Sequence, residues 1–261
     1  MTDLYIPTKT DAGYRLRVTR GATVGPEGNK FLMGGVNFAA ALEALEVATQ
    51  APVLYASAQF LSFARLDDVV DIAPTLLSEG KSVTQASAVN RVGEREILRV
   101  SAALGARDTD EARQFLVMPG VPGPAECPIV TKDRDADDLS AHIEKRLCVE
   151  DPKTGLGIQW IRYLPAAPLR IGLIALIADH LAGALPRTRG AASLDNHLRV
   201  MHRPRTEWIL CETQMSAYLQ GFMHGQTRMF AQDGSLIAIA SQSAALPRRG
   251  GGWAQSQARE A

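Results

Sequence analysis

The sequence predicts an α+β fold built from two similar halves, and three observations lead to that prediction. Each half contains one long apolar segment of helical character, at 34–49 and at 169–185. A strand-like run precedes each helix, and four β-like runs follow it. A long apolar helix followed by an antiparallel meander is typical of a helix covered by a curved sheet. We therefore interpret the chain as an internal duplication whose residue identities have diverged.

The first half opens with an expected strand at 14–19, followed by a Gly-rich turn. The helix at 34–49, GGVNFAAALEALEVAT, is dense in Ala, which favours helix formation. Glu43 and Glu46 mark the side of this helix that we expect to face solvent. Four strands are predicted after the helix, at 53–64, 69–77, 82–92 and 96–104.

Residues 105–157 differ in character from both halves. Four prolines fall between Pro119 and Pro128, and RDADD at 134–138 is polar and acidic, as in a solvated linker. We expect one short helix there, at about 137–147. The segment is therefore interpreted as the connection between two units.

The second half repeats the first pattern. A strand at 158–164 precedes the helix at 169–185, and Asp233-Gly234 indicates a hairpin turn. The four later strands are predicted at 190–201, 206–216, 221–231 and 235–246. The expected division is an N-terminal unit at 1–104, a linker at 105–157, a C-terminal unit at 158–247 and a flexible Gly-rich tail at 248–261.

Composition excludes several classes of protein. A formal net charge of +0 at pH 7 gives no sign of the basic face that a nucleic-acid-binding protein needs. Cys127, Cys148 and Cys211 match no zinc or disulfide spacing, which favours a reduced, cytoplasmic environment. The most apolar stretch, 164–186, contains prolines and charged residues, so it predicts a core helix and no membrane span. The N-terminus lacks the apolar run of a signal peptide, and we expect neither a cofactor nor a metal.

Asp179 lies inside the apolar second helix, next to His180. That helix is apolar on nearly all sides, which indicates burial. A buried carboxylate that is only partly hydrogen-bonded costs about 1–3 kcal/mol. Asp179 is therefore either functional, or it faces a water-filled seam or a partner such as Arg170. The residues alone leave both interpretations open, whereas for His180 we expect a structural role.

A functional Asp179 requires polar side chains on nearby strands, and two candidates are present. Ser193 lies in AASLDNH, on the strand directly after the helix, and Gln242 lies in IAIASQSAAL, on the last strand. Either residue alone is weak evidence. Together, a carboxylate, a hydroxyl and an amide can hold a water molecule, and the carboxylate can accept its proton.

Four segments share their pattern with a known family. MGGVNFAAAL at 33–42 contains a Gly-Gly pair that opens a helix, and QFLSFAR at 59–65 is an aromatic-Leu strand after it. ASLDNHLRVMHRP at 192–204 contains Ser-x-Asp and then His-Arg-Pro, and MFAQDGSLIAIASQSA at 229–244 is an Asp-Gly hairpin that leads to Gln. On these segments the chain resembles the type II acyl-CoA thioesterases of the double hot-dog fold. In that fold two tandem units each wrap a curved antiparallel sheet around a long central helix.

This resemblance implies a catalytic Asp179, Ser193 and Gln242. In the family, the corresponding three residues orient a water that attacks the thioester carbonyl without a covalent acyl-enzyme. A positioned general base contributes roughly 10²–10⁴-fold to such a reaction. The expected function is hydrolysis of acyl-CoA to free fatty acid and CoA, in lipid metabolism.

The first half departs from the family pattern. Relatives often carry Gln where this chain has Val36, and a His on the next strand where it has Leu54 or Ser57. Aligning the two terminal hairpins places Ser101 opposite Gln242, and no Asp–Ser–Gln set is evident in the first half. We therefore expect one site per chain, with the first half as a structural partner that shapes the channel for the acyl and pantetheine groups.

Other readings are weaker. The chain has no G-x-S-x-G motif for a serine hydrolase, and Cys211, a possible nucleophile with His202, lies in an apolar strand. A hot-dog enoyl-CoA hydratase needs a His–Asp pair, but adjacent helix positions such as Asp179 and His180 point about 100° apart. A non-catalytic acyl-CoA-binding protein is the alternative of a different class.

The predicted partner is an acyl-CoA substrate. The phosphates of CoA could be held by Arg91, Arg203 or Arg205, with no basis for a choice. Sheet edges in such folds are commonly covered by another copy, so we expect a homodimer or a higher homo-oligomer.

Overall fold

A computed structural model of the chain describes residues 4–109, 111–130 and 137–247. The tail predicted at 248–261 and part of the predicted linker lie outside the described residues. The helices are α1 (Gly34–Thr49) and α2 (Ile171–Ala178), with 3-10 turns η1 (Arg20–Ala22), η2 (Leu139–His142), η3 (Asp179–Gly183) and η4 (Pro186–Thr188). The strands before α1 are β1 (Thr8–Thr10), β2 (Gly13–Arg17), β3 (Thr23–Val24) and β4 (Phe31–Leu32).

The strands between the two helices and after the second one form most of the sheet. Between α1 and α2 lie β5 (Val53–Phe60), β6 (Val69–Glu79), β7 (Val83–Val92), β8 (Arg95–Gly105), β9 (Ile143–Asp151) and β10 (Leu156–Tyr163). After α2 come β11 (Ala192–Ser193), β12 (Asp195–Val200), β13 (Ile209–Leu219), β14 (Phe222–Ala231) and β15 (Leu236–Ala245). The predicted strands after each helix are therefore present, with boundaries that shift by a few residues.

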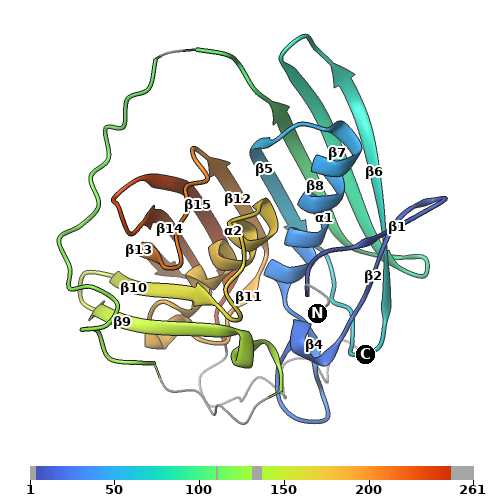
Figure 1. Cartoon of the computed structure of the whole chain (residues 1–261). Helices are drawn as coiled ribbons and strands as arrows, with labels where there is room; N and C mark the ends of the chain where they lie inside the picture. Colours follow the sequence, from blue (N-terminus) through green and yellow to red (C-terminus); the bar gives the residue numbers. More distant parts are fainter. Residues whose placement is uncertain (1–3, 110, 131–136, 248–261) are drawn as a thin grey trace.

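The strand order reveals the relation between the halves. One antiparallel sheet runs β1-β2-β6-β7-β8-β5-β12-β15-β14-β13-β10-β9. The order β2-β6-β7-β8-β5 in the first half is mirrored by β10-β13-β14-β15-β12 in the second half. The halves meet where β5 and β12 pair, with Ser57 opposite His197. The sheet is therefore continuous across the junction (Figure 1).

The two helices pack against each other inside this sheet (Figure 1). All eight residues of α2 are buried, as its uniform apolarity predicts, and so are most residues of α1. Small residues permit the close approach: a Cβ on Gly35 would lie 3.0 Å from the carbonyl oxygen of Leu176. The ends of the two helices are thereby brought into contact.

The structure corrects three predictions. The helix expected at 169–185 is α-helical only to Ala178, and η3 continues it. The short helix expected at 137–147 is wrong: η2 is followed by β9, which pairs with β10. Glu43 does not face solvent, since it is only 3% exposed.

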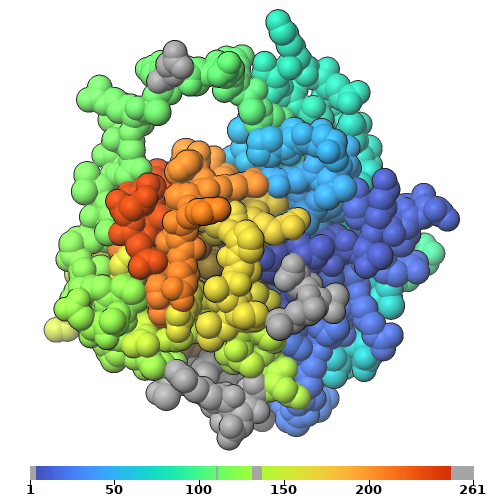
Figure 2. All heavy atoms as spheres, viewed as in Figure 1, coloured from blue at the N-terminus to red at the C-terminus, as the bar shows by residue number. Residues whose placement is uncertain are grey.

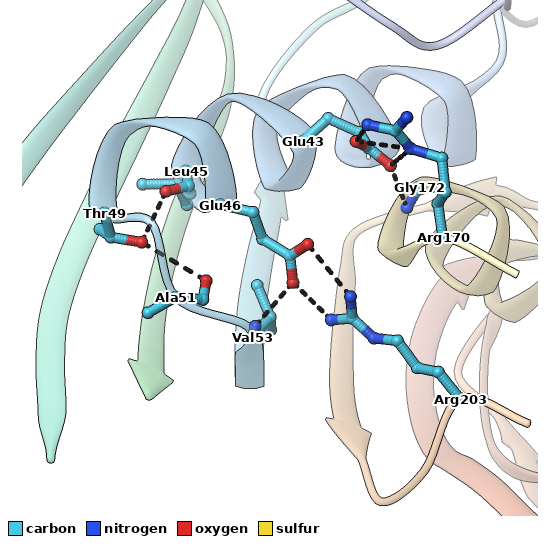
Figure 3. A network of polar contacts seen from close by, with 9 residues as sticks. All are labelled: Glu43, Leu45, Glu46, Thr49, Ala51, Val53, Arg170, Gly172 and Arg203. Carbon is cyan, nitrogen blue, oxygen red and sulfur yellow. Dashed lines mark hydrogen bonds and ion pairs between the residues drawn. The ribbon is translucent and has the colours of Figure 1, made fainter. Parts of the chain in front are cut away.

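Two arginines of the second half reach the glutamates of α1 (Figure 3). Arg170 binds Glu43 with a shortest N–O distance of 2.6 Å, and Arg203, from the His-Arg-Pro segment after β12, binds Glu46. Glu46 also accepts the backbone N–H of Val53, at 2.7 Å. These ion pairs tie α1 to the second half.

The segment that connects β8 to β9 crosses the outside of the molecule. Figure 2 shows its first part as a green arch with open space beneath it. Farther on, the carbonyl oxygen of Pro122 accepts the indole N–H of Trp160 at 3.0 Å. The Sγ atoms of Cys127 and Cys148 lie 2.7 Å apart, a proximity that their spacing in the sequence did not indicate. No helix in the described part of the chain is both long and apolar enough to span a membrane.

Candidate active site

Asp179 is the first residue after α2, at the point where the α-helix tightens into η3. Its backbone N–H still bonds to the carbonyl oxygen of Ala175, so the helix fixes its position. The residue is 7% exposed. The prediction that this carboxylate is buried in protein is confirmed.

Ser193 and Gln242 lie against this carboxylate. The hydroxyl of Ser193 donates to Asp179 Oδ1 at 3.2 Å, and the amide Nε2 of Gln242 donates to the same oxygen at 2.6 Å. Gln242 Nε2 also donates to Ser193 Oγ at 2.9 Å. Ser193 on β11 and Gln242 on β15 are neighbours because these strands pair, with Ser193 opposite Ala244. The structure therefore brings all three predicted site residues into one hydrogen-bonded group.

The Gly-Gly pair at the start of α1 completes the surroundings of Asp179. The backbone N–H of Gly35 donates a hydrogen bond to the carboxylate. A Cβ on Gly35 would lie 2.8 Å from Asp179 Cβ, and a Cβ on Gly34 would lie 3.1 Å from Asp179 Oδ2. Only glycine permits this approach. The motif was visible in the sequence, but its contact with a residue of the other half was not.

Asn196 is a further neighbour that sequence reasoning missed. It lies on β12, is fully buried, and its side chain favours the charged form of Asp179. The only signal in the sequence was an Asn at a core position of a strand that starts with Asp195.

The pKa of Asp179 reflects two opposed effects. Burial penalises the charged form and raises the pKa from 3.8 to about 6. The hydrogen bonds from Gln242, Gly35 and Ser193, with the side chain of Asn196, limit that rise. The result is a carboxylate that is ionised at neutral pH yet basic enough to accept a proton.

A cavity of about 800 Å³ opens beside this group, with Asp179 and Ser193 in its wall. Both halves line it. The first half contributes mainly apolar side chains: Val24, Phe31, Leu32, Met33, Phe60, Leu61 and Phe63. The rest of the chain contributes further apolar side chains together with four polar ones: Lys145, Gln159, His180 and Arg189. A long, partly apolar molecule can therefore lie across the carboxylate, in contact with both halves.

The other candidates from the sequence are placed elsewhere. Arg170 does not pair with Asp179, because it binds Glu43. His180 turns away from the group, and its Nδ1 lies 3.1 Å from Lys145 Nζ. Burial raises the pKa of Cys211 to about 12, which opposes a thiolate nucleophile.

Two of the three arginines considered as ligands for the CoA phosphates form ion pairs within the chain. Arg91 binds Glu96 at 2.5 Å, and Arg203 binds Glu46. Both guanidinium groups are thus engaged in ion pairs within the chain.

The chain is similar to known proteins over most of its length. A sequence model of the acyl-CoA thioesterase C-terminal domain matches residues 124–246. The crystal structure of a candidate thioesterase from Novosphingobium aromaticivorans is 32% identical, with a TM-score of 0.87, and the match covers 95% of this chain and 100% of that one. No curated protein sequence matches significantly.

More distant structures share the fold. A hot-dog protein of unknown function from Alicyclobacillus acidocaldarius is 17% identical, with a TM-score of 0.82, over 94% of this chain and 97% of that one. An acyl-CoA thioesterase II from Mycobacterium marinum is 18% identical, with a TM-score of 0.75, over 94% and 96%. The fold is therefore of the hot-dog type. The chain belongs to the type II acyl-CoA thioesterase family and is a thioester hydrolase.

Proposed function

We propose that the protein hydrolyses acyl-CoA to a free fatty acid and CoA, with Asp179, Ser193 and Gln242 as its catalytic residues. One observation carries the proposal. The Ser193 hydroxyl and the Gln242 amide both donate to a single oxygen of Asp179, Oδ1. The other oxygen, Oδ2, lies beside Gly34, which lines the cavity. One carboxylate oxygen is thus held in place while the second can act as the base.

The proposed reaction has two steps. Asp179 accepts a proton from a water as the water oxygen attacks the thioester carbonyl carbon, which gives a tetrahedral intermediate. The C–S bond then breaks, and the protonated Asp179 returns its proton to the departing CoA sulfur. Acyl-CoA and water are converted to carboxylic acid and CoA, with no covalent acyl-enzyme. The N-terminal end of α1, the positive end of its dipole, favours the negative charge that develops beside it.

The position of the base supports this reaction over hydration of an enoyl group. A hydratase would need a His beside the carboxylate over the acyl chain. His180 instead lies against Lys145, and no other His lines the cavity among the residues that the structure describes. A non-catalytic acyl-CoA-binding protein is the remaining alternative, and the raised pKa of Asp179 favours a catalytic role over it.

The direct test is release of thiol from a series of acyl-CoA thioesters of increasing chain length. Steady release of CoA, with the free acid identified by mass spectrometry, is the expected result. Binding without release would support the acyl-binding alternative. Loss of enoyl absorbance without thiol would support the hydratase.

We extend the proposal to the organisation of the chain. The chain would then form two tandem hot-dog units, 1–104 and 158–247, joined by 105–157, with the catalytic residues in the second unit. The mirrored strand order supports this division. Exposed apolar side chains at the strand ends, such as Leu77 and Leu219, favour a homo-oligomer. Light scattering at several protein concentrations tests the assembly. The cysteine pattern supports a cytoplasmic location.

A further inference from the structure

Asn37 is a polar residue in the cavity wall that has no role in the proposed reaction. It lies on α1, three residues after Gly34, and residues at this spacing share one face of a helix. Gly34 faces Asp179 Oδ2, and Gly34 and Asn37 both line the cavity. Asn37 therefore lies one helical turn after Gly34, the residue beside the proposed base, in the wall of the same cavity.

A single neighbour sets the orientation of the Asn37 amide. The Nδ2 atom of Asn90, on β7, donates to the backbone oxygen of Asn37 at 3.2 Å and to its Oδ1 at 2.7 Å. A backbone carbonyl can only accept, so the Asn90 atom that faces it must be nitrogen. The Asn37 atom in contact with that nitrogen must then be oxygen. The Nδ2 group of Asn37 is consequently directed away from Asn90.

This amide nitrogen has no acceptor among the described residues, whereas Asn37 is 4% exposed and lines the cavity. Asn90 is fully buried, and its own Oδ1 atom has no hydrogen-bond partner in the described part of the chain. Such a buried, half-satisfied pair lowers stability relative to apolar residues of the same shape. A function in ligand binding accounts for its presence.

We infer that Asn37 donates a hydrogen bond from Nδ2 to an oxygen of the acyl thioester, and that Asn90 is the positioning residue that fixes this donor. The inference rests on the proposed function, since it names the group that the cavity binds next to the base. Two oxygens of a substrate could be the acceptor. One is the thioester carbonyl, and the other is a hydroxyl or keto oxygen on the acyl chain near it.

The test compares three variants: Asn37→Leu, Asn90→Leu and the double variant. Each single substitution leaves one buried amide without its hydrogen-bond partner. The double substitution removes both polar partners and should restore the melting temperature. A matched control is Thr213→Val, which breaks the buried hydroxyl pair of Thr213 and Thr227, 2.7 Å apart, neither of which lines the cavity.

The readouts are kcat/KM for hexanoyl-CoA, 3-hydroxyhexanoyl-CoA and 3-oxohexanoyl-CoA, and the affinity for a ketone analogue in which CH₂ replaces the thioester sulfur. We expect Asn37→Leu and the double variant to lose about tenfold or more in kcat/KM, and Asn90→Leu to lose less. An equal loss on all substrates identifies the thioester carbonyl as the acceptor. A loss confined to the oxygenated substrates identifies the chain oxygen.

The inference is overturned if activity follows stability, so that the double variant recovers full kcat/KM, or if Asn37→Leu behaves like Thr213→Val. Failure of the proposed function is distinguishable from this result. In that case the unmodified protein releases no thiol from any substrate, while binding of the ketone analogue still reports whether Asn37 contacts the ligand.

Discussion

Glu43 accepts the backbone N–H of Gly172 at 3.0 Å, in the same relation that Asp179 has to Gly35. Gly35 and Gly172 are the second residues of α1 and α2. Each helix therefore presents an N–H near its start to a carboxylate carried by the other helix. The two places differ in what else binds the carboxylate: Ser193 and Gln242 hold Asp179, whereas Arg170 holds Glu43. The carboxylate of Asp179 is thus bound by neutral donors, whereas that of Glu43 forms an ion pair.

Replacement of Arg170 by Met should lower stability and leave the chemistry intact. Glu43 is 3% exposed, so loss of its partner leaves a buried carboxylate. Because Arg170 is itself half exposed, we expect a loss of only about 1–3 kcal/mol in the free energy of unfolding, measured in urea. Arg228→Met is the matched control, because Arg228 is about as exposed as Arg170 while its partner Glu212, at 3.2 Å, is less buried than Glu43. An equal effect of the two substitutions would contradict the assigned role of Arg170.

Asp179→Asn should abolish most of the activity while the protein remains folded. The substitution removes the base, so kcat should fall by about 10²-fold or more. Turnover of acyl-CoA and the melting temperature are measured together. If Asp179 is the base as proposed, Asp179→Ala is expected to be neutral or stabilising, because it removes a buried polar group that is kept for chemistry. A marked drop in melting temperature would instead indicate a structural role for this residue.

The activity should depend on pH through the ionisation of Asp179. Its pKa of about 6 predicts that kcat/KM is constant above that pH and falls about tenfold per pH unit below it. The acid limb of a pH profile checks this value. It is measured with one acyl-CoA over the pH range in which the protein remains folded. An acid limb near pH 4 would mean that the carboxylate is solvated.

The same pKa predicts the stability difference between Asp179→Asn and the unmodified protein. The folded pKa, about 6, exceeds the unfolded value of 3.8, so the folded state binds the proton more tightly. Above pH 6 the charged carboxylate therefore lowers the free energy of unfolding by on the order of 3 kcal/mol. This destabilisation disappears as the pH falls from 6 towards 4. Relative to the unmodified protein, the variant should be most stable above pH 6. Urea unfolding at pH 5 and pH 8 tests the sign.

Gly35→Ala should reduce both stability and activity. Its Cβ would lie 2.8 Å from Asp179 Cβ and 3.0 Å from the backbone oxygen of Leu176, and neither atom can move easily. Overpacking of this kind costs about 1–3 kcal/mol, more than Ala gains from its helix propensity. Calorimetry and turnover are measured beside Gly120→Ala, whose Cβ would meet nothing within 4 Å. Unchanged activity in Gly35→Ala would show that the helix start does not position the base.

Much of the architecture was accessible from the sequence because it depends on local pattern. The strands after each helix follow from turn residues and β-like runs, and burial of Asp179 follows from the apolar residues around it. Ser193 and Gln242 were weak candidates on their own residues and became specific through the family motifs. The structure then brought them within hydrogen-bond distance of Asp179.

What the sequence could not reveal depends on partners that lie far along the chain. Glu43 was expected to face solvent because its partner, Arg170, is 127 positions away. At 143–151 the apolar Ile143 and Leu147 fit both the spacing of a helix and that of a strand, and pairing with β10 decides for the strand. Asn37 gave no signal, because only Asn90 on β7 fixes its amide.

The continuous pairing of β5 with β12 has a consequence for how such a protein can change. In an assembly of two identical subunits, every substitution occurs twice, once on each side of the symmetry axis. Here one polypeptide supplies both sides of the seam, so a mutation alters a single side. The groups around Glu43 and those around Asp179 are therefore free to diverge independently, one towards an ion pair and the other towards a carboxylate bound by neutral donors.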